Sequence, residues 1–212
     1  MLGDPKPMEW LLDQIEPQSG ALQIVGIDGG GGAGKTTLAR RLQKTSSRVQ
    51  CVHVDDFYRP SPDDPKLRAE PCWFFDWRRI RDEVLVPLKR GEAAQFRPYD
   101  WHAERLSDDE ISVEPRGIVI LEGISALRRE LRPWIDVGLW VETPPDIRLE
   151  RGVERDGEDA RDTWVDFWMT EEERYFDAHQ PHLFAQVSIY GDAPRDAGQE
   201  VPTVRILERL DP

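Results

Sequence analysis

The chain has 212 residues, of which 33% are charged and 39% hydrophobic, a balance typical of a globular protein and not of a disordered chain. Its length predicts a single domain spanning residues 1–212. The net charge of -13 argues against a protein that binds nucleic acid or an anionic membrane, because both need a basic surface.

The sequence also argues against a membrane or secreted protein. No apolar stretch approaches the roughly 18–20 residues that cross a bilayer, and the N-terminus lacks the apolar segment of a signal peptide. The two cysteines, Cys51 and Cys72, have no metal-ligand spacing and form no disulfide framework. We therefore expect a cytoplasmic protein without membrane partners.

Short apolar runs alternate with helical patterns along the chain. An N-terminal helical appendage is expected at 1–21, and a long loop rich in Pro and Asp at 59–71. A helix is expected to begin with Thr143 as its N-cap and Pro144 as its first residue, and to end at Gly157. This alternation predicts an α/β fold with a mainly parallel sheet. The other expected helices are 8–15, 34–44, 76–90, 124–131 and 160–179, and the expected strands are 22–27, 50–54, 95–99, 118–121, 137–141, 187–189 and 204–207.

Residues 29–36 fit the phosphate-binding pattern G-x-x-x-x-G-K-[ST] between the first of these strands and the next helix. Glycines free the backbone N–H groups to surround a polyphosphate, and the helix that follows directs its positive end at the anion. Lys35 adds a charge for the β- and γ-phosphates, and the Thr36 hydroxyl suits Mg²⁺. A flexible linker would not carry Gly-Lys-Thr at this offset. The predicted ATP-binding residues are Gly29, Gly30, Gly31, Gly32, Ala33, Gly34, Lys35, Thr36 and Thr37.

Acidic residues follow two further expected strands, at Asp55-Asp56 and at Glu122. The carboxyl ends of parallel strands share one edge of a sheet, so these groups should meet the P-loop there. Glu122 suits the Mg²⁺ site, and Asp55 suits a base for a substrate hydroxyl, although Asp56 remains an alternative to Asp55. The simpler interpretation is that each acid is exposed and merely ends a strand.

Arginines at 148, 151 and 155 mark a second candidate site, on the helix that ends at Gly157. Arg151 and Arg155 are four residues apart and share one helical face. Arginines on a closing lid stabilise the charge of a transferring phosphoryl group and exclude water. The alternative is surface pairing with neighbouring acids, which contributes little.

Aromatic residues are dense between 57 and 101, where they suit a planar ligand or a small-molecule pocket, although core packing is the commoner role. His53 and His102 have no partners at ligand spacing, so we expect no metal site made of histidines.

These motifs resemble the uridine kinase and phosphoribulokinase-like P-loop kinases over about residues 22–190. The resemblance implies the P-loop three-layer sandwich fold. It also implies a single P-loop kinase domain with a helical, arginine-bearing lid at about 146–165. It implies Asp55 as general base, from Asp55-Asp56-Phe57-Tyr58, and Glu122 for Mg²⁺, from Glu122-Gly123-Ile124. The implied catalytic residues are Asp55, Lys35, Arg151 and Arg155, and the implied substrate residues are Tyr58, Phe75, Asp76, Tyr99 and Arg105.

The sequence departs from the family pattern at the residues that read the nucleobase. After Tyr99-Asp100-Trp101, His102 and Arg105 stand at different offsets from the family's His and Arg. Asp56 stands where the family has Ser, and Gly152 where it has an arginine. The kinase core is therefore matched more closely than the acceptor pocket.

The leading hypothesis is an ATP- and Mg²⁺-dependent phosphotransferase that acts on a hydroxyl of a small metabolite, foremost the 5′-hydroxyl of uridine or cytidine. One alternative is a kinase of another alcohol, such as a sugar phosphate or pantothenate. Another is a nucleotide-dependent switch or ATPase without a small acceptor. Uridine kinases are often oligomeric, so a homo-oligomer stays open, but the sequence marks no interface.

Overall fold

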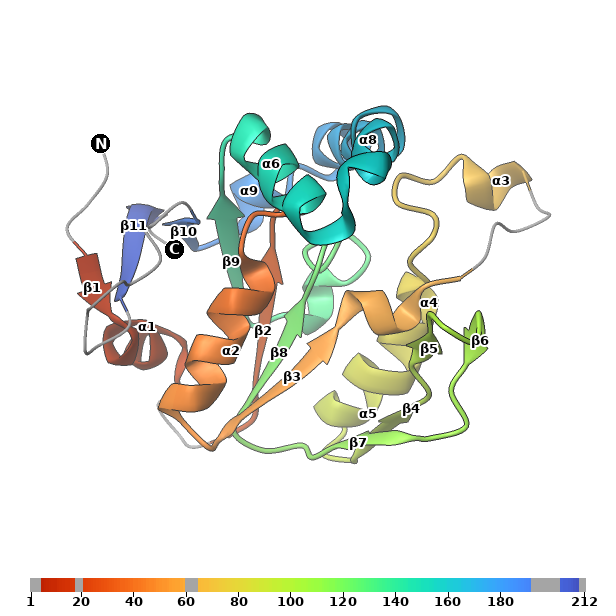
Figure 1. Ribbon diagram of the computed structural model, residues 1–212. Helices are drawn as coiled ribbons and strands as arrows, with labels where there is room; N and C mark the ends of the chain where they lie inside the picture. The colour runs from red at the N-terminus through yellow and green to blue at the C-terminus, as the bar shows by residue number, and fades with distance from the viewer. Residues whose placement is uncertain (1–4, 18–20, 60–64, 192–202, 210–212) are drawn as a thin grey trace.

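A seven-stranded sheet with helices on both faces forms the centre of the computed structural model (Figure 1), which describes residues 5–17, 21–59, 65–191 and 203–209. The strand order is β1-β11-β10-β9-β2-β8-β3. The five strands from β10 to β3 are parallel, and β11 and β1 are added antiparallel at one edge. The prediction of an α/β fold with a mainly parallel sheet is confirmed.

The strands of this sheet are β1 (Pro5–Pro7), β2 (Gln23–Asp28), β3 (Val49–His53), β8 (Ile118–Glu122), β9 (Val137–Glu142), β10 (Val187–Tyr190) and β11 (Thr203–Arg209). Two small hairpins beside it contain β4 (Ala94–Phe96), β5 (Tyr99–Asp100), β6 (Arg105–Leu106) and β7 (Ile111–Val113). The helices are α1 (Met8–Ile15), α2 (Lys35–Thr45), α3 (Pro65–Arg68), α4 (Trp77–Arg79), α5 (Val86–Lys89), α6 (Pro145–Asp156), α7 (Arg161–Thr163), α8 (Thr170–His179) and α9 (Pro181–Phe184).

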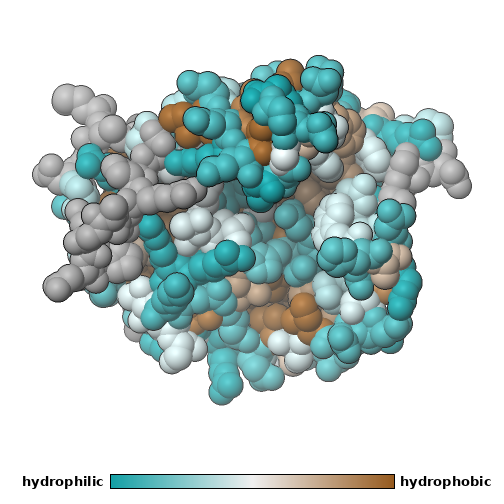
Figure 2. Space-filling view, viewed as in Figure 1, coloured by the Kyte–Doolittle hydropathy of each residue, from teal (hydrophilic) through white to brown (hydrophobic). Residues whose placement is uncertain are grey.

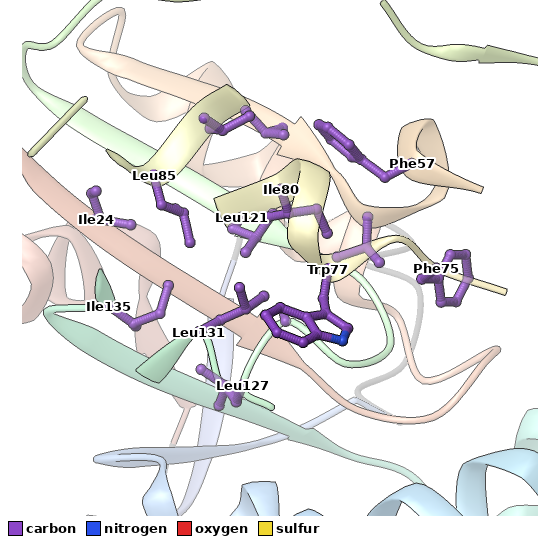
Figure 3. Close-up of a cluster of buried hydrophobic side chains, with 14 of the residues drawn as sticks. Ile24, Phe57, Phe75, Trp77, Ile80, Leu85, Leu121, Leu127, Leu131 and Ile135 are labelled. Atoms are coloured by element: carbon purple, nitrogen blue, oxygen red, sulfur yellow. The ribbon is translucent and has the colours of Figure 1, made fainter. Parts of the chain in front are cut away.

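The sheet separates two hydrophobic cores, because successive side chains of a strand point to opposite faces. Along β8, Ile118 and Ile120 join the core under α1 and α2, whereas Val119 and Leu121 join the core on the other face. The second core includes Phe57, Trp77 and Ile80 (Figure 3). Apolar residues on both faces explain why these strands are continuous apolar runs in the sequence.

Most expected elements occur near their predicted positions. The helix expected at 76–90 is a continuous helical run from α4 through a π-helical segment, Ile80–Leu85, to α5, and Pro87 lies in the first turn of α5. The helix expected at 160–179 is likewise continuous from α7 through a π-helical segment, Trp164–Met169, to α8. The strand expected at 95–99 is divided between β4 and β5.

Two local predictions are wrong. Residues 124–131 form turns and not a helix: Ser125 has a φ of 73°, in the left-handed region, and the Leu127 N–H donates to the Asp28 carboxylate. Thr143 is not the N-cap of α6, because the helix begins at Pro145 with Pro144 as its cap. The Thr143 hydroxyl instead donates to the Ala33 carbonyl, 3.0 Å away.

The N-terminal segment packs on the main domain. Met8, Leu11 and Ile15 of α1 are buried in the core that contains α2, and β1 pairs with β11. Residues 1–4 and 18–20 of the expected appendage, and 60–64 of the expected loop at 59–71, lie outside the described residues. Over the part of the chain that is described, no helix combines the length and apolar character needed to cross a bilayer.

Candidate active site at the P-loop

The register of the parallel strands brings the predicted P-loop and acids to one edge of the sheet. Ile27 of β2 is paired with Glu122 of β8, and Glu122 is paired with His53 of β3. The P-loop therefore follows β2 at the level where Glu122 ends β8, and Asp55 lies just beyond β3. Helices α6 and α8 lie above this edge (Figure 1).

The P-loop itself is held in a shape that needs glycine. Gly32 has a φ of 74°, and a Cβ there would lie 2.5 Å from the Arg148 carbonyl oxygen. Helix α2 begins at Lys35, so its N-terminal N–H groups face the loop. The Lys35 ammonium donates to the Gly30 carbonyl at 2.9 Å, which curls the side chain back over the loop.

Asp28, the last residue of β2, holds the start of this loop in place. Its fully buried carboxylate accepts hydrogen bonds from the N–H groups of Gly29 and Leu127, and from the Tyr175 hydroxyl at 2.6 Å. Burial raises the pKa of Asp28, and the Tyr175 hydrogen bond opposes that rise. Helix α8 is thereby attached to the end of β2.

We expect Tyr175→Phe to lower the free energy of unfolding by about 1–3 kcal/mol, because it removes a hydrogen bond from a buried carboxylate. Tyr58→Phe is the control, since the Tyr58 hydroxyl has no hydrogen-bond partner among the described residues and should cost less than about 0.5 kcal/mol. Chemical denaturation measures both. Equal losses in the two variants would contradict the anchoring role.

Thr36 and Glu122 offer oxygen ligands beside the P-loop. The Thr36 hydroxyl donates to Glu122 Oε1 at 2.9 Å, and His53 Nδ1 lies 2.6 Å from the same oxygen. Burial acts to raise the pKa of Glu122, but the His53 hydrogen bond and the Lys35 charge outweigh it and leave that pKa lowered. An ionised carboxylate and a hydroxyl beside a phosphate site fit Mg²⁺, which takes few protein ligands and completes its shell with water and phosphate oxygens.

Asp55 and Asp56 lie in the 3₁₀ turn Val54–Phe57, and only Asp55 lines the cavity described below. Asp55 is exposed to the solvent of that cavity. The protein around the carboxyl group still desolvates it, which raises the pKa of Asp55, while the Lys35 ammonium opposes the rise. Lys35 is thus close enough to influence the candidate base.

A cavity of about 1100 Å³ joins these groups. Its walls come from the P-loop and α2, from the ends of β3 and β8, and from α6 and the helical run that leads to α8. Hydrophilic side chains dominate the face of the molecule seen in Figure 2. Figure 1 shows α6 and α8 above the sheet in the same view. Among the predicted site residues, the cavity is lined by Gly31, Gly32, Gly34, Lys35, Thr36, Thr37, Asp55, Phe75, Glu122, Arg151 and Arg155.

Arg151 and Arg155, which are predicted to belong to a lid, point in different directions. Arg151 donates to the carbonyls of Gly32 and Gly191, at 3.3 and 3.1 Å. Arg155 forms a two-bond pair with Asp156, at 2.7 and 2.9 Å, and remains largely exposed. Gly152 faces the Trp164 ring, which a Cβ would approach to 2.4 Å, so the indole occupies the space where the family carries an arginine side chain.

The predicted acceptor residues are only partly on the cavity. Tyr58 contacts Tyr99 and Trp101, with ring centroids 4.9 and 4.4 Å apart, but only Trp101 of these three lines the cavity. Asp76 caps α4 and lies 3.6 Å from Arg59, and Arg105 pairs with Asp108 on the surface. Asp76 and Arg105 are therefore not brought to the cavity wall.

Cavity-lining residues that the sequence did not predict include Trp164, Trp168 and Glu172, from the helical run that leads into α8. Trp164 and Trp168 lie in the helix that we expected at 160–179, and their spacing of four residues indicates a shared face but no particular partner. Glu172 is the middle one of three successive glutamates, so its sequence context gives no signal.

Comparison with known families matches residues 25–177 to a family described as AAA domain. A uridine kinase from Staphylococcus aureus is 33% identical over 144 residues, which is 64% of this chain and 69% of that protein. The chain belongs to the uridine kinase family of P-loop proteins. A uridine kinase from Halobacterium salinarum is 33% identical over 139 residues, and the match spans 62% of this chain and 61% of that protein's length.

Solved structures agree on the fold. A possible uridine kinase from Bacillus stearothermophilus has a TM-score of 0.65 at 20% identity, covering 85% of this chain and 96% of that one. A D-glycerate 3-kinase from Cryptococcus neoformans has a TM-score of 0.59 at 16% identity, covering 86% and 91%. At these identities the likeness concerns the fold, which is that of P-loop kinases.

Proposed function

We propose that this member of the uridine kinase family transfers the γ-phosphate of ATP to a hydroxyl of a small metabolite, foremost the 5′-hydroxyl of uridine or cytidine. The observation that carries the proposal is the position of Asp55. It lines the same cavity as Lys35, Thr36 and Glu122, so a base and a phosphate-binding loop face one space. A protein that only binds and hydrolyses a nucleotide has no need of a base for an alcohol.

The residues divide the work of phosphoryl transfer between them. The P-loop N–H groups and Lys35 hold the β- and γ-phosphates, and Asp55 accepts the proton of the acceptor hydroxyl as that oxygen attacks. Thr36 and Glu122 would hold Mg²⁺, which supplies charge neutralisation on the phosphates. Arg151 and Arg155, which line the cavity from the lid, stabilise the transferring group and exclude water.

The acceptor is proposed to lie against the aromatic wall. Phe75, Trp101 and Trp168 line the cavity, and flat apolar rings favour an acceptor with a planar group, such as a nucleobase. The uridine kinase names of the relatives support the same choice. A different alcohol stays as the second candidate, because Asp76 is engaged with Arg59 and with the start of α4.

We expect Arg155→Ala to lower kcat by about 10- to 100-fold, the equivalent of one charge-assisted hydrogen bond, with a much smaller loss of ATP affinity. The reason is that its contact with the phosphoryl group forms mainly in the transition state. Steady-state kinetics and calorimetry measure the two quantities. Arg161→Ala is the control, because Arg161 is an exposed lid arginine that pairs with Glu158 away from the cavity. Equal losses of kcat and ATP affinity in Arg155→Ala would contradict a catalytic role for Arg155.

The proposed function is tested by ADP release from Mg-ATP in the presence of a panel of acceptors. The panel contains uridine, cytidine, other nucleosides, ribulose 5-phosphate, pantothenate, glycerate and simple sugars. Stimulation by uridine or cytidine is the expected result. Stimulation by another alcohol alone would support a kinase reaction with a different acceptor. Slow ADP release that no acceptor changes would favour the ATPase or switch.

A further inference from the structure

A buried carboxylate accepts a hydrogen bond from one of the backbone N–H groups with which a P-loop binds anions. Glu172 of α8 has a side chain that is only 1% exposed, and its Oε1 accepts a hydrogen bond from the Gly31 N–H at 2.8 Å. P-loops present such N–H groups to phosphate oxygens. The Glu172 carboxylate therefore lies where a phosphate oxygen of a bound nucleotide would accept a hydrogen bond.

Lys35 shows which phosphate this position would serve. Its ammonium donates to the Gly30 carbonyl at 2.9 Å, so it lies beside the peptide that joins Gly30 to Gly31. A P-loop lysine reaches the β- and γ-phosphates, not the α-phosphate. The Gly31 N–H is therefore at the end of the loop that receives the terminal phosphates of a triphosphate.

Arg148 is the counter-ion of this carboxylate. Its Nη1 lies 2.5 Å from Glu172 Oε2, and its side chain is 8% exposed. A Cβ on Gly30 would come within 1.9 Å of the same Nη1, so the guanidinium lies directly against the loop. A guanidinium buried this far needs an anionic partner, and Glu172 provides it.

We propose that Glu172 is a displaceable substitute for the terminal phosphate of the nucleotide, and that Arg148 exchanges Glu172 for that phosphate when a triphosphate binds. A phosphate oxygen and the Glu172 carboxylate cannot both take the Gly31 N–H, because the repulsion between two anions in a poorly solvated site is costly. Glu172 therefore withdraws and Arg148 keeps an anionic partner throughout. This inference rests on the proposed function only in requiring that the P-loop binds a nucleoside triphosphate.

The exchange makes the lid sensitive to the third phosphate. Arg148 belongs to α6, which also carries the cavity-lining Arg151 and Arg155, and Glu172 belongs to α8. A change of partner at Arg148 therefore acts on α6 and α8 together. A diphosphate, which lacks the terminal group, leaves Glu172 on the Gly31 N–H. Arg148 and Glu172 thus become residues that distinguish ATP from ADP.

The test is nucleotide binding by Glu172→Gln, measured by calorimetry with Mg²⁺ and either ADP or a non-hydrolysable ATP analogue. Glutamine keeps an oxygen for the Gly31 N–H but removes the charge that competes with the phosphate. We expect the Kd of the triphosphate to fall about tenfold and that of ADP to change by less than about threefold. Glu173→Gln, one residue away on the exposed face of α8, removes the same charge and should change neither Kd.

A purely structural role for Glu172 predicts the opposite result. Glu172→Gln would then bind the triphosphate as the unaltered protein does, or more weakly, and this result overturns the proposal. The double variant Arg148→Met/Glu172→Gln should lose the tenfold gain, because the guanidinium that takes the phosphate is gone. Failure of the unaltered protein to bind either nucleotide would instead count against the proposed function.

The unaltered protein gives a second test that does not depend on how well a variant folds. In a crystal structure with Mg²⁺ and the ATP analogue, Glu172 Oε1 should no longer be within hydrogen-bond distance of the Gly31 nitrogen, and Arg148 should contact the terminal phosphate. A structure in which the analogue is bound and the Glu172–Gly31 bond is intact overturns the proposal.

Discussion

Asp55→Asn should lower kcat for phosphoryl transfer by about 10²- to 10⁴-fold, the usual contribution of a positioned general base. The variant keeps the size of the side chain and removes its ability to take a proton. ATP affinity should stay close to that of the unaltered protein, because the P-loop and Lys35 are untouched. Steady-state kinetics with a saturating acceptor, together with a binding titration of ATP, measures both quantities.

Asp56→Asn is the matched control for this variant. Asp56 is the next residue of the same 3₁₀ turn, but it does not line the cavity, so its change should leave kcat nearly unaltered. If Asp56→Asn loses activity and Asp55→Asn does not, the assignment of the base is reversed. If neither loses activity, the base mechanism is wrong.

The pH profile supplies an independent check on Asp55. The base works only when it is ionised, and burial raises the pKa of Asp55 above its ordinary value. Activity should therefore fall with decreasing pH, with a midpoint above the value of about 3.9 that is typical of an aspartate. The residual activity of Asp55→Asn should lack this acid limb.

Gly32→Ala should abolish most nucleotide binding. Gly32 has a φ of 74°, and an added Cβ would lie 2.5 Å from the Arg148 carbonyl, so the loop must shift. A left-handed conformation alone costs an alanine about 1–2 kcal/mol. Loss of two charge-assisted hydrogen bonds, at about 1.5–3 kcal/mol each, corresponds to a decrease in ATP affinity of on the order of 100-fold or more.

Gly91→Ala is the control that separates the cost of a left-handed backbone from the cost of the close contact between residue 32 and the Arg148 carbonyl. Gly91 has a nearly equal φ of 77°, but no atom lies within 4 Å of the position of its Cβ. This variant should lose about 1–2 kcal/mol of unfolding free energy and no nucleotide affinity. Similar ATP binding by Gly32→Ala and the unaltered protein would show that the loop does not need this close contact with α6.

The sequence predicts two kinds of site residue: those of a contiguous motif, and those that directly follow a strand of the parallel sheet. The P-loop is a contiguous motif, and its residues meet the ligand through their own backbone. Asp55 and Glu122 are far apart in the sequence, but each follows a buried strand, and parallel strands end at one edge of the sheet. Apolar runs at 22–27, 118–121 and 137–141 were sufficient to predict those strands.

The parts that were missed depend on contacts between distant segments. The apolar spacing of Ile124, Leu127 and Leu131 is typical of a helix. The segment instead forms turns that bury Leu127 and Leu131, because the Asp28 carboxylate binds the Leu127 N–H. Glu172 has glutamates on both sides, and only the fold shows which of the three reaches the P-loop. The strand β1, Pro5–Pro7, contains two prolines, which fit a strand only at the edge of a sheet.

The most direct test of the proposed reaction is to follow where the γ-phosphate goes. Mg-ATP and uridine or cytidine are incubated with the protein, and the products are analysed by ³¹P NMR. We expect a phosphate monoester on the acceptor in amounts equal to the ADP formed. Inorganic phosphate equal to the ADP, with no monoester on any acceptor tested, would contradict a kinase and indicate an ATPase.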